Sequence, residues 1–144
     1  MPRSYAAALD ARFAQLRPWP DVQQTLTALK AAGVTIGVVT NCSERLGRIA
    51  AGCLGIEIDV LVTAERAGFY KPHPRTYGLA IEELGVAGDR CLFVAGSAYD
   101  LFGTAKVGLP AYWHDRLGMT PPAGMPEPIA RERTLGPLLQ LVLR

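Results

Sequence analysis

The chain has 144 residues, 49% of them hydrophobic, which is enough material for the core of one domain. Its 15 Lys and Arg against 13 Asp and Glu give a net charge of +2, with the basic residues scattered along the chain. This pattern argues against nucleic acid or a membrane surface as partners. The three cysteines form no CxxC motif, and no segment reads as a signal peptide or membrane span, so we expect a cytoplasmic location.

The sequence alternates helical and strand-like segments. In chain order, the predicted elements are a helix over residues 5–16, a helix over 22–32, a strand over 34–39, a helix over 43–54, a strand over 59–63, a helix over 74–84, a strand over 91–94, a helix over 98–107, a strand over 110–113 and a helix over 134–143. Asp21 is expected to cap the second helix, and residues 119–128, rich in Pro and Gly, to form a surface loop. Strands that alternate with helices predict an α/β fold, with a Rossmann-like parallel sheet covered by helices on both faces.

Polar residues gather where three of the predicted segments end. The three stretches are residues 38–41 (VVTN), 70–74 (YKPHP) and 93–100 (FVAGSAYD). Active sites of open α/β sheets lie at the carboxyl ends of the strands. We therefore expect the polar side chains of these stretches to meet in one pocket.

The order and the residues of these three stretches resemble the motifs of the haloacid dehalogenase-like hydrolase superfamily, and the resemblance covers residues 17–143. It implies that residues 1–17 are the remnant of a cap helix and its linker, and that residues 18–144 form the core domain. It further implies that the Thr40 hydroxyl binds an anionic substrate or intermediate, and that the Lys71 ammonium neutralises charge on the nucleophile and the intermediate. Asp100 matches the last acid of the family's fourth motif.

The fourth motif also separates the branches of this superfamily. In the phosphatases its acids hold magnesium, whereas here Gly96 falls where the first of them would stand, so we expect no metal and no cofactor. Ser97, Tyr99 and Tyr77 match places typical of the type II 2-haloacid dehalogenases. The resemblance implies catalytic roles for Lys71, Asp100 and Thr40, and substrate-binding roles for Asn41, Tyr77, Ser97 and Tyr99. The implied partner is a small anion such as a 2-haloacid.

The family's first motif, a strand that ends in the nucleophilic aspartate, is missing from this sequence. Asp10, Asp21 and Asp59 lie in helical, capping or strand-opening contexts, so none replaces it. The family places that strand between the strand that ends at Thr40 and the strand that ends at Ala95, so its loss should divide the sheet. Either the sequence is a truncated copy, or the two strands pair directly, or another chain supplies the strand, for example in a homodimer.

Three hypotheses of function follow. The first is a 2-haloacid dehalogenase whose nucleophile lies outside this sequence. The second is a catalytically inactive domain that binds a small anion or a partner chain, and the third is a phosphatase of the same superfamily. Whether this chain is itself an enzyme is left open.

Simpler interpretations of single residues also stand. Thr40, Asn41, Ser97 and Asp100 could serve as helix caps, Lys71 as a solvated loop residue and Tyr77 as core packing. Residues 95–99 do not match the Gly-x-Ser-x-Gly elbow of serine hydrolases. A reactive Cys42 lacks an identifiable base, and His73 and His114 lack neighbouring metal ligands.

Overall fold

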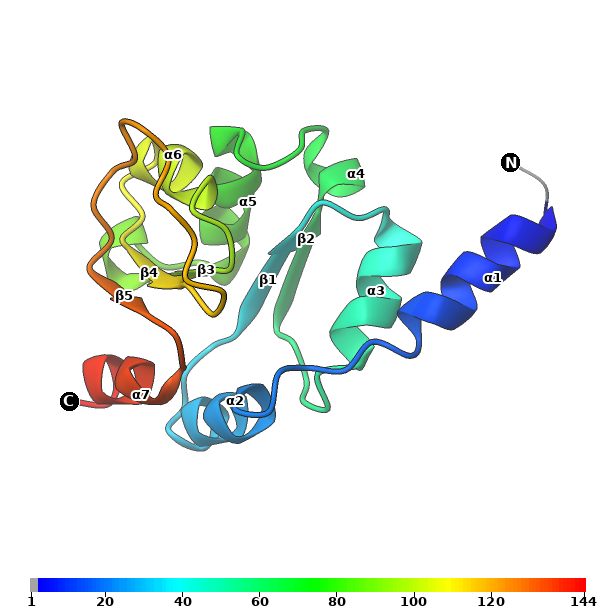
Figure 1. Cartoon of the computed structure of the whole chain (residues 1–144), viewed down its shortest axis with the longest axis horizontal. Coiled ribbons are helices and arrows are strands. Elements are labelled where there is room, and N and C mark those ends of the chain that lie inside the picture. Colours follow the sequence, from blue (N-terminus) through cyan, green and yellow to red (C-terminus); the bar gives the residue numbers. More distant parts are fainter. Residues whose placement is uncertain (1–2) are drawn as a thin grey trace.

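The computed structural model describes residues 3–144. In chain order its elements are α1 (Arg3–Phe13), α2 (Val22–Ala31), β1 (Gly37–Thr40), α3 (Glu44–Gly52), β2 (Val60–Thr63), α4 (Ala64–Ala67), α5 (Pro74–Leu84), the short 3-10 helix η1 (Gly88–Arg90), β3 (Phe93–Ala95), α6 (Asp100–Ala105), β4 (Ala111–His114), β5 (Ala130–Glu132) and α7 (Gly136–Val142). All three strand pairings are parallel, and the fold is the predicted α/β type (Figure 1).

The parallel strands form two separate sheets. One contains β1 and β2, and the other has the order β3-β4-β5. Within residues 3–144, β1 does not pair with β3, so the predicted division of the sheet is confirmed and the alternative in which the two strands pair directly is wrong. Each sheet holds a complete crossover of its own, through α3 in one and α6 in the other, so neither needs the other for its ladder.

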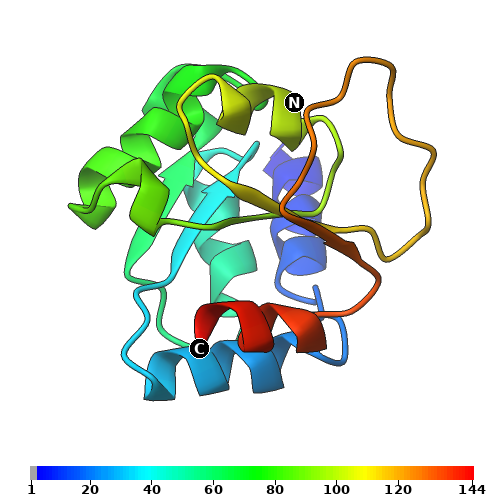
Figure 2. The same cartoon turned by 90° about the vertical axis from the view of Figure 1, so that its left-hand side faces the viewer.

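The two strands that border this division, β1 and β3, leave apolar side chains partly exposed. Figures 1 and 2 show β1 and β3 on the sides of their sheets that face each other. Val94 on β3 is 39% exposed, whereas Tyr112 beside it on β4 is fully buried. Val38 and Val39 of β1 are half-buried, while Val62 of β2 is fully buried. Apolar strand residues are therefore left exposed along the line where the sheet is divided.

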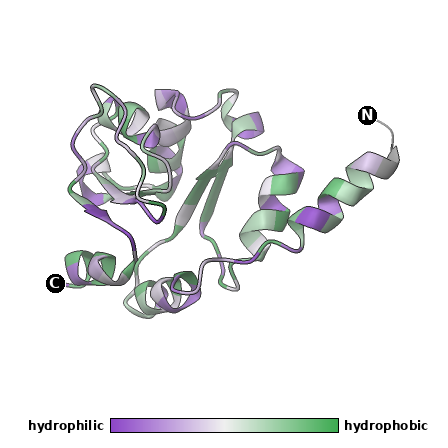
Figure 3. Ribbon diagram, in the orientation of Figure 1, coloured by the Kyte–Doolittle hydropathy of each residue, from purple (hydrophilic) through white to green (hydrophobic). Residues whose placement is uncertain are grey.

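Helices cover both faces of the second sheet. On one face, Leu101 and Ala98 of the α6 region lie against Ala95, Ala111 and Trp113. On the other face, Leu29 of α2 and Leu135 and Leu138 near α7 pack around Tyr112. In the first sheet, α3 and α5 lie on opposite sides of β1 and β2 (Figure 1). Figure 3 colours β2 as hydrophobic and β5 as hydrophilic, which fits a covered strand and an edge strand.

Among the strands and α-helices, β5 and α4 have no counterpart in the sequence-based predictions. The edge strand β5 lies in a segment with no predicted strand, because Arg131 and Glu132 give it a polar pattern. Its position is held by Arg131, which pairs with the buried Asp115. The one-turn helix α4 was also not predicted, and Thr63 caps it by accepting the N–H of Arg66. Asp21 makes no side-chain cap bond to α2; it accepts the N–H of Leu135 and pairs with Arg116.

The N-terminal helix α1 lies beside α3. Asp10 pairs with Arg45, and the thiol of Cys53 donates to the carbonyl of Phe13 over 3.5 Å. The first two residues of the proposed cap remnant, residues 1–17, lie outside the described residues. The boundary between this remnant and the core domain, residues 18–144, stays a prediction. No helix in the described part of the chain is long and apolar enough to cross a membrane.

Candidate active site

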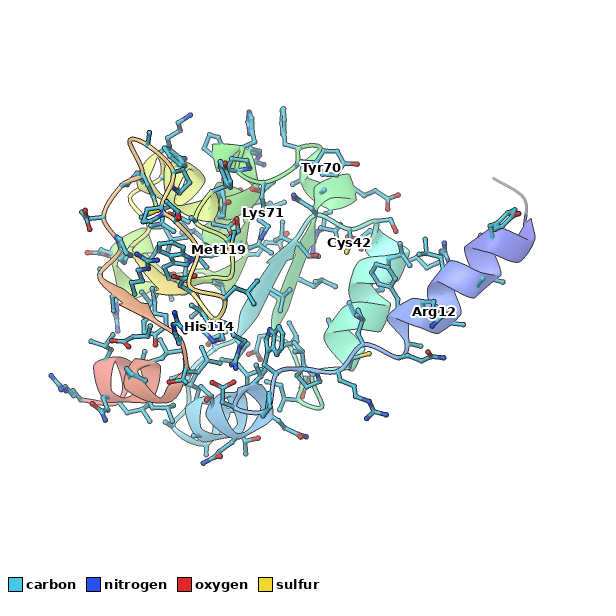
Figure 4. The ribbon with its side chains drawn as sticks, in the orientation of Figure 1. Arg12, Cys42, Tyr70, Lys71, His114 and Met119 are labelled. Carbon is cyan, nitrogen blue, oxygen red and sulfur yellow. The ribbon has the colours of Figure 1, made fainter. Side chains whose placement is uncertain are left out.

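Lys71 is held in place through its own backbone. The side-chain oxygen of Asn41 accepts the N–H of Lys71 over 2.7 Å, and the amide nitrogen of Asn41 donates to the carbonyl of Lys71 over 3.3 Å. Asn41 directly follows β1, so this pair of bonds fixes Lys71 to the carboxyl end of that strand. Figure 4 shows Lys71 near this end of β1, well apart from His114 on the side of α2. Asn41 is thus partly used inside the protein, and its role in substrate binding stays a prediction.

The ammonium of Lys71 forms a polar cluster with Asp100 and Tyr77. Its Nζ lies 3.2 Å from Oδ1 and 3.5 Å from Oδ2 of Asp100, the first residue of α6. The hydroxyl of Tyr77, on α5, donates to Oδ1 of the same carboxylate over 2.6 Å. We call Lys71, Asp100 and Tyr77 the lysine cluster. Asp100 and Tyr77 are buried, whereas the Lys71 side chain is 22% exposed, so the charge of the cluster reaches the surface only through lysine.

Local sequence explains how this cluster forms. His73 caps α5 by accepting the N–H of Arg75 at Nδ1, and Pro74 occupies the first turn, as predicted, where its missing N–H is not needed. Tyr77 then follows within the second turn and points toward α6. Burial and, after it, the hydrogen bond to Asp100 raise the pKa of the Tyr77 phenol well above its ordinary value. Tyr77 therefore acts here as a hydrogen-bond donor that stays protonated.

Phe93 is a member of this region that sequence reasoning missed. Its ring meets the Tyr77 ring edge-on at 5.2 Å between centroids, and the Lys71 ammonium lies 5.8 Å from its centroid. An aromatic face near an ammonium adds a weak attraction and excludes water from one side. In the sequence, Phe93 is an aromatic residue in the strand that precedes the fourth motif. Aromatic residues are common in buried strands, so this position alone did not indicate a role near Lys71.

The remaining predicted site residues lie outside the lysine cluster. Thr40 ends β1, and its hydroxyl donates to the sulfur of Cys42 over 3.2 Å. Ser97 is exposed, and its oxygen accepts the N–H of Tyr99 over 3.3 Å. The Tyr99 side chain is 62% exposed, near Phe102. Among the described residues, no hydrogen bond joins these three side chains to Lys71, so their predicted roles stay untested.

A hollow of about 450 Å³ is lined by residues that follow β1 and by residues that precede Lys71. Cys42 belongs to the first group, and the aromatic residues Phe69 and Tyr70, the latter adjacent to Lys71 in sequence, belong to the second. Over residues 3–144 there is no group of three or more His, Cys, Asp or Glu arranged to hold a metal ion. Metal-independent chemistry stays a prediction of the sequence, based on Gly96 at the position where the phosphatases have a metal-binding acid.

The parallel α/β fold thus brings a buried carboxylate and a partly exposed ammonium together near the carboxyl ends of its strands, where open α/β sheets keep their active sites. A family model described as haloacid dehalogenase-like hydrolase matches residues 4–108. The chain belongs to this family. The resemblance carried by the three sequence stretches is therefore confirmed.

The similar proteins include several 2-haloacid dehalogenases. The chain is 31% identical to (S)-2-haloacid dehalogenase 1 of a Pseudomonas species over 138 residues, which cover 94% of the chain and 60% of that protein. The crystal structure of an L-2-haloacid dehalogenase matches all of the chain and 64% of its own, with a TM-score of 0.84 and 27% identity. The structure of a phosphatase of the same superfamily from Thermococcus onnurineus matches 96% of the chain and 64% of its own, with a TM-score of 0.82 and 28% identity. The chain spans about half the length of the curated relatives it matches.

Proposed function

We propose that the full-length protein hydrolyses a small 2-haloacid, with an aspartate nucleophile supplied by a segment outside this sequence. The single observation that carries this proposal is the lysine cluster. The backbone of Lys71 is anchored by Asn41, and its ammonium is paired with Asp100 and partly open to solvent beside the divided sheet. A strand placed between β1 and β3 would bring its own carboxyl end to the same side as Lys71.

The proposed reaction has two steps. The carboxylate attacks C2 of the haloacid, the carbon–halogen bond breaks, and halide leaves with the bonding electrons. Water then adds to the carbonyl carbon of the resulting ester, and the bond from this carbon to the oxygen attached to C2 breaks, which releases a 2-hydroxyacid and a proton and regenerates the carboxylate. Lys71 stabilises negative charge on the nucleophile and on the ester intermediate, and Asp100 holds its ammonium in place. Thr40, Asn41, Ser97, Tyr77 and Tyr99 are the proposed contacts to the substrate or intermediate.

The first measurement is the intact mass of the protein isolated from its source cells. A mass above 15.5 kDa is expected, since this sequence accounts for 15.5 kDa without the nucleophile strand. The protein of that mass is then assayed for halide release from 2-chloropropionate. Lys71→Ala should abolish release, whereas Lys106→Ala, which removes an exposed lysine at the end of α6, should leave it unchanged. Equal turnover by both variants would overturn the proposal.

A second candidate function is an inactive domain that binds a small anion or a partner chain. It is favoured by one observation: within the described residues, the Lys71 ammonium is already neutralised by Asp100. This candidate expects a natural mass of 15.5 kDa and no turnover. It also expects a saturable rise in melting temperature with small carboxylates or phosphate, or a homodimer formed through the unpaired strands and detected by light scattering.

A phosphatase activity is the third candidate, supported by the similar phosphatase structure. It would show magnesium-dependent hydrolysis of a phosphate monoester. Gly96 in place of a metal-binding acid argues against it. Parallel assays with a haloacid and with p-nitrophenyl phosphate separate the two hydrolase candidates.

A further inference from the structure

Gly103 lies where α6 comes closest to the lysine cluster. It is buried in α6, three residues after Asp100 and therefore on the same face of the helix. A Cβ atom built at this position would overlap the ring of Tyr77 and the carbonyl oxygen of Pro72, and it would lie 3.0 Å from the carbonyl carbon of Pro72. These neighbours are a backbone group and a fully buried ring, neither of which is the free end of a flexible side chain. Any side chain at position 103 must therefore move α6 or its neighbours.

The neighbours of Gly103 are the same segments that carry the lysine cluster. Pro72 directly follows Lys71, and Tyr77 donates the 2.6 Å hydrogen bond to Asp100. The Lys71 backbone is tied to β1 through Asn41, so it cannot follow α6 if that helix moves away. A shift of α6 would lengthen the Lys71–Asp100 and Tyr77–Asp100 distances together.

We propose that Gly103 is a positioning residue of the lysine cluster: its lack of a side chain lets α6 rest directly on Pro72 and Tyr77 and so sets the contacts of Asp100 with Lys71 and Tyr77. The expected effect of Gly103 on turnover rests on the function proposed above. The role of Gly103 in setting the contacts of Asp100 does not depend on that function. Displacement of a reacting group by 1 Å can cost on the order of 10²-fold in rate.

The test compares Gly103→Ala with Gly78→Ala in the protein at its natural length. Gly78 lies in α5 next to Tyr77, and a Cβ there would meet nothing within 4 Å, so it is a matched helical control. The Tyr77 hydroxyl is followed by NMR after labelling tyrosine at Cζ, with the resonance assigned from Tyr77→Phe. Gly103→Ala should shift this resonance, whereas Gly78→Ala should leave it unchanged.

Turnover gives the second readout. We expect Gly103→Ala to lower kcat for halide release at least tenfold while KM changes less than threefold, since the displaced groups act on the reacting carboxylate. A Gly103→Ala protein with an unchanged Tyr77 resonance would overturn the inference, even if its stability fell. Should the wild type release no halide while the Tyr77 signal still responds, the function proposed above fails and the positioning role stands.

One measurement on the wild type covers the case in which Gly103→Ala does not fold. In the described structure the Gly103 backbone lies against the Tyr77 ring, so its Hα protons should show nuclear Overhauser contacts to the ring protons. Finding these contacts supports the close approach of α6. Their absence from a spectrum in which both residues are assigned would overturn the inference.

Discussion

The phenol of Tyr77 donates a 2.6 Å hydrogen bond to Oδ1 of Asp100, and this bond joins α5 to α6 in the interior of the protein. Asp100 has the Lys71 ammonium on the same oxygen, 3.2 Å away. The carboxylate therefore receives a neutral and a charged donor from two different segments. A charged acceptor strengthens such a bond relative to a neutral one.

Replacing Tyr77 with Phe removes the neutral donor. We expect the free energy of unfolding to fall by about 2 kcal/mol, because a buried carboxylate loses one of its hydrogen bonds. Tyr70→Phe is the matched control, since the Tyr70 side chain is 70% exposed and its loss of a hydroxyl should change little. Urea unfolding of both variants measures the difference. Equal stability of the two would show that the bond contributes nothing net.

Alkaline pH should destabilise the fold through two tyrosines. Burial raises the pKa of Tyr112 to about 12, and burial raises the pKa of Tyr77 further. Because both values lie above the ordinary pKa of about 10, the stabilisation is complete below pH 10 and is lost as the pH rises through the folded-state values. We expect the unfolding free energy to fall above about pH 10, with a shallower slope in Tyr77→Phe. A slope identical to that of the wild type would contradict the prediction.

Mild acid should destabilise the fold through His114. Burial, and then the nearby Arg116 guanidinium, lower the pKa of this imidazole, and the opposing Asp21 carboxylate and the Arg133 backbone do not offset them. A lowered folded-state pKa means that the stabilisation is present above the ordinary value of about 6.5 and is lost as the pH falls below it.

The check is a melting-temperature series between pH 8 and pH 5. We expect the wild type to lose stability in this window and His114→Gln to lose less, since glutamine does not become charged. Parallel curves for wild type and His114→Gln would rule out His114 as the origin of the acid sensitivity.

Asp115 should hold the edge strand β5. Its buried carboxylate accepts the N–H of Met119 and pairs with Arg131, which also lies over the Trp113 ring at 4.2 Å. Asp115→Ala is expected to lower the free energy of unfolding by about 2 kcal/mol, less than for a fully buried pair because Arg131 stays partly in water. Hydrogen exchange of the residue 130–132 amides should accelerate in this variant. Retained protection there would contradict the prediction.

Local sequence was sufficient to place most of the elements. The predicted helix over residues 74–84 agrees with α5, because a proline in the first turn and Gly85, with a φ of 67°, define both of its ends. The β-branched run before Thr40 predicted a strand, although β1 begins at Gly37 rather than at residue 34. The family resemblance also predicted the divided sheet. Caps, breakers and apolar runs act over a few residues, so they can be recognised without knowing the fold.

Contacts between distant segments were decided by the tertiary structure alone. Asp21 satisfied every local criterion for a helix cap, yet its carboxylate binds Leu135, 114 residues further along. The sequence motifs indicated Lys71, Asp100 and Tyr77 separately, and only the fold brings Lys71 and Tyr77 to the Asp100 carboxylate. The fold also leaves Ser97 and Tyr99 exposed to solvent. The constraint on Gly103 is likewise invisible in sequence, because it depends on how closely two helices approach. Local patterns determine which segments form helices and strands, whereas the distances between side chains depend on how those segments pack.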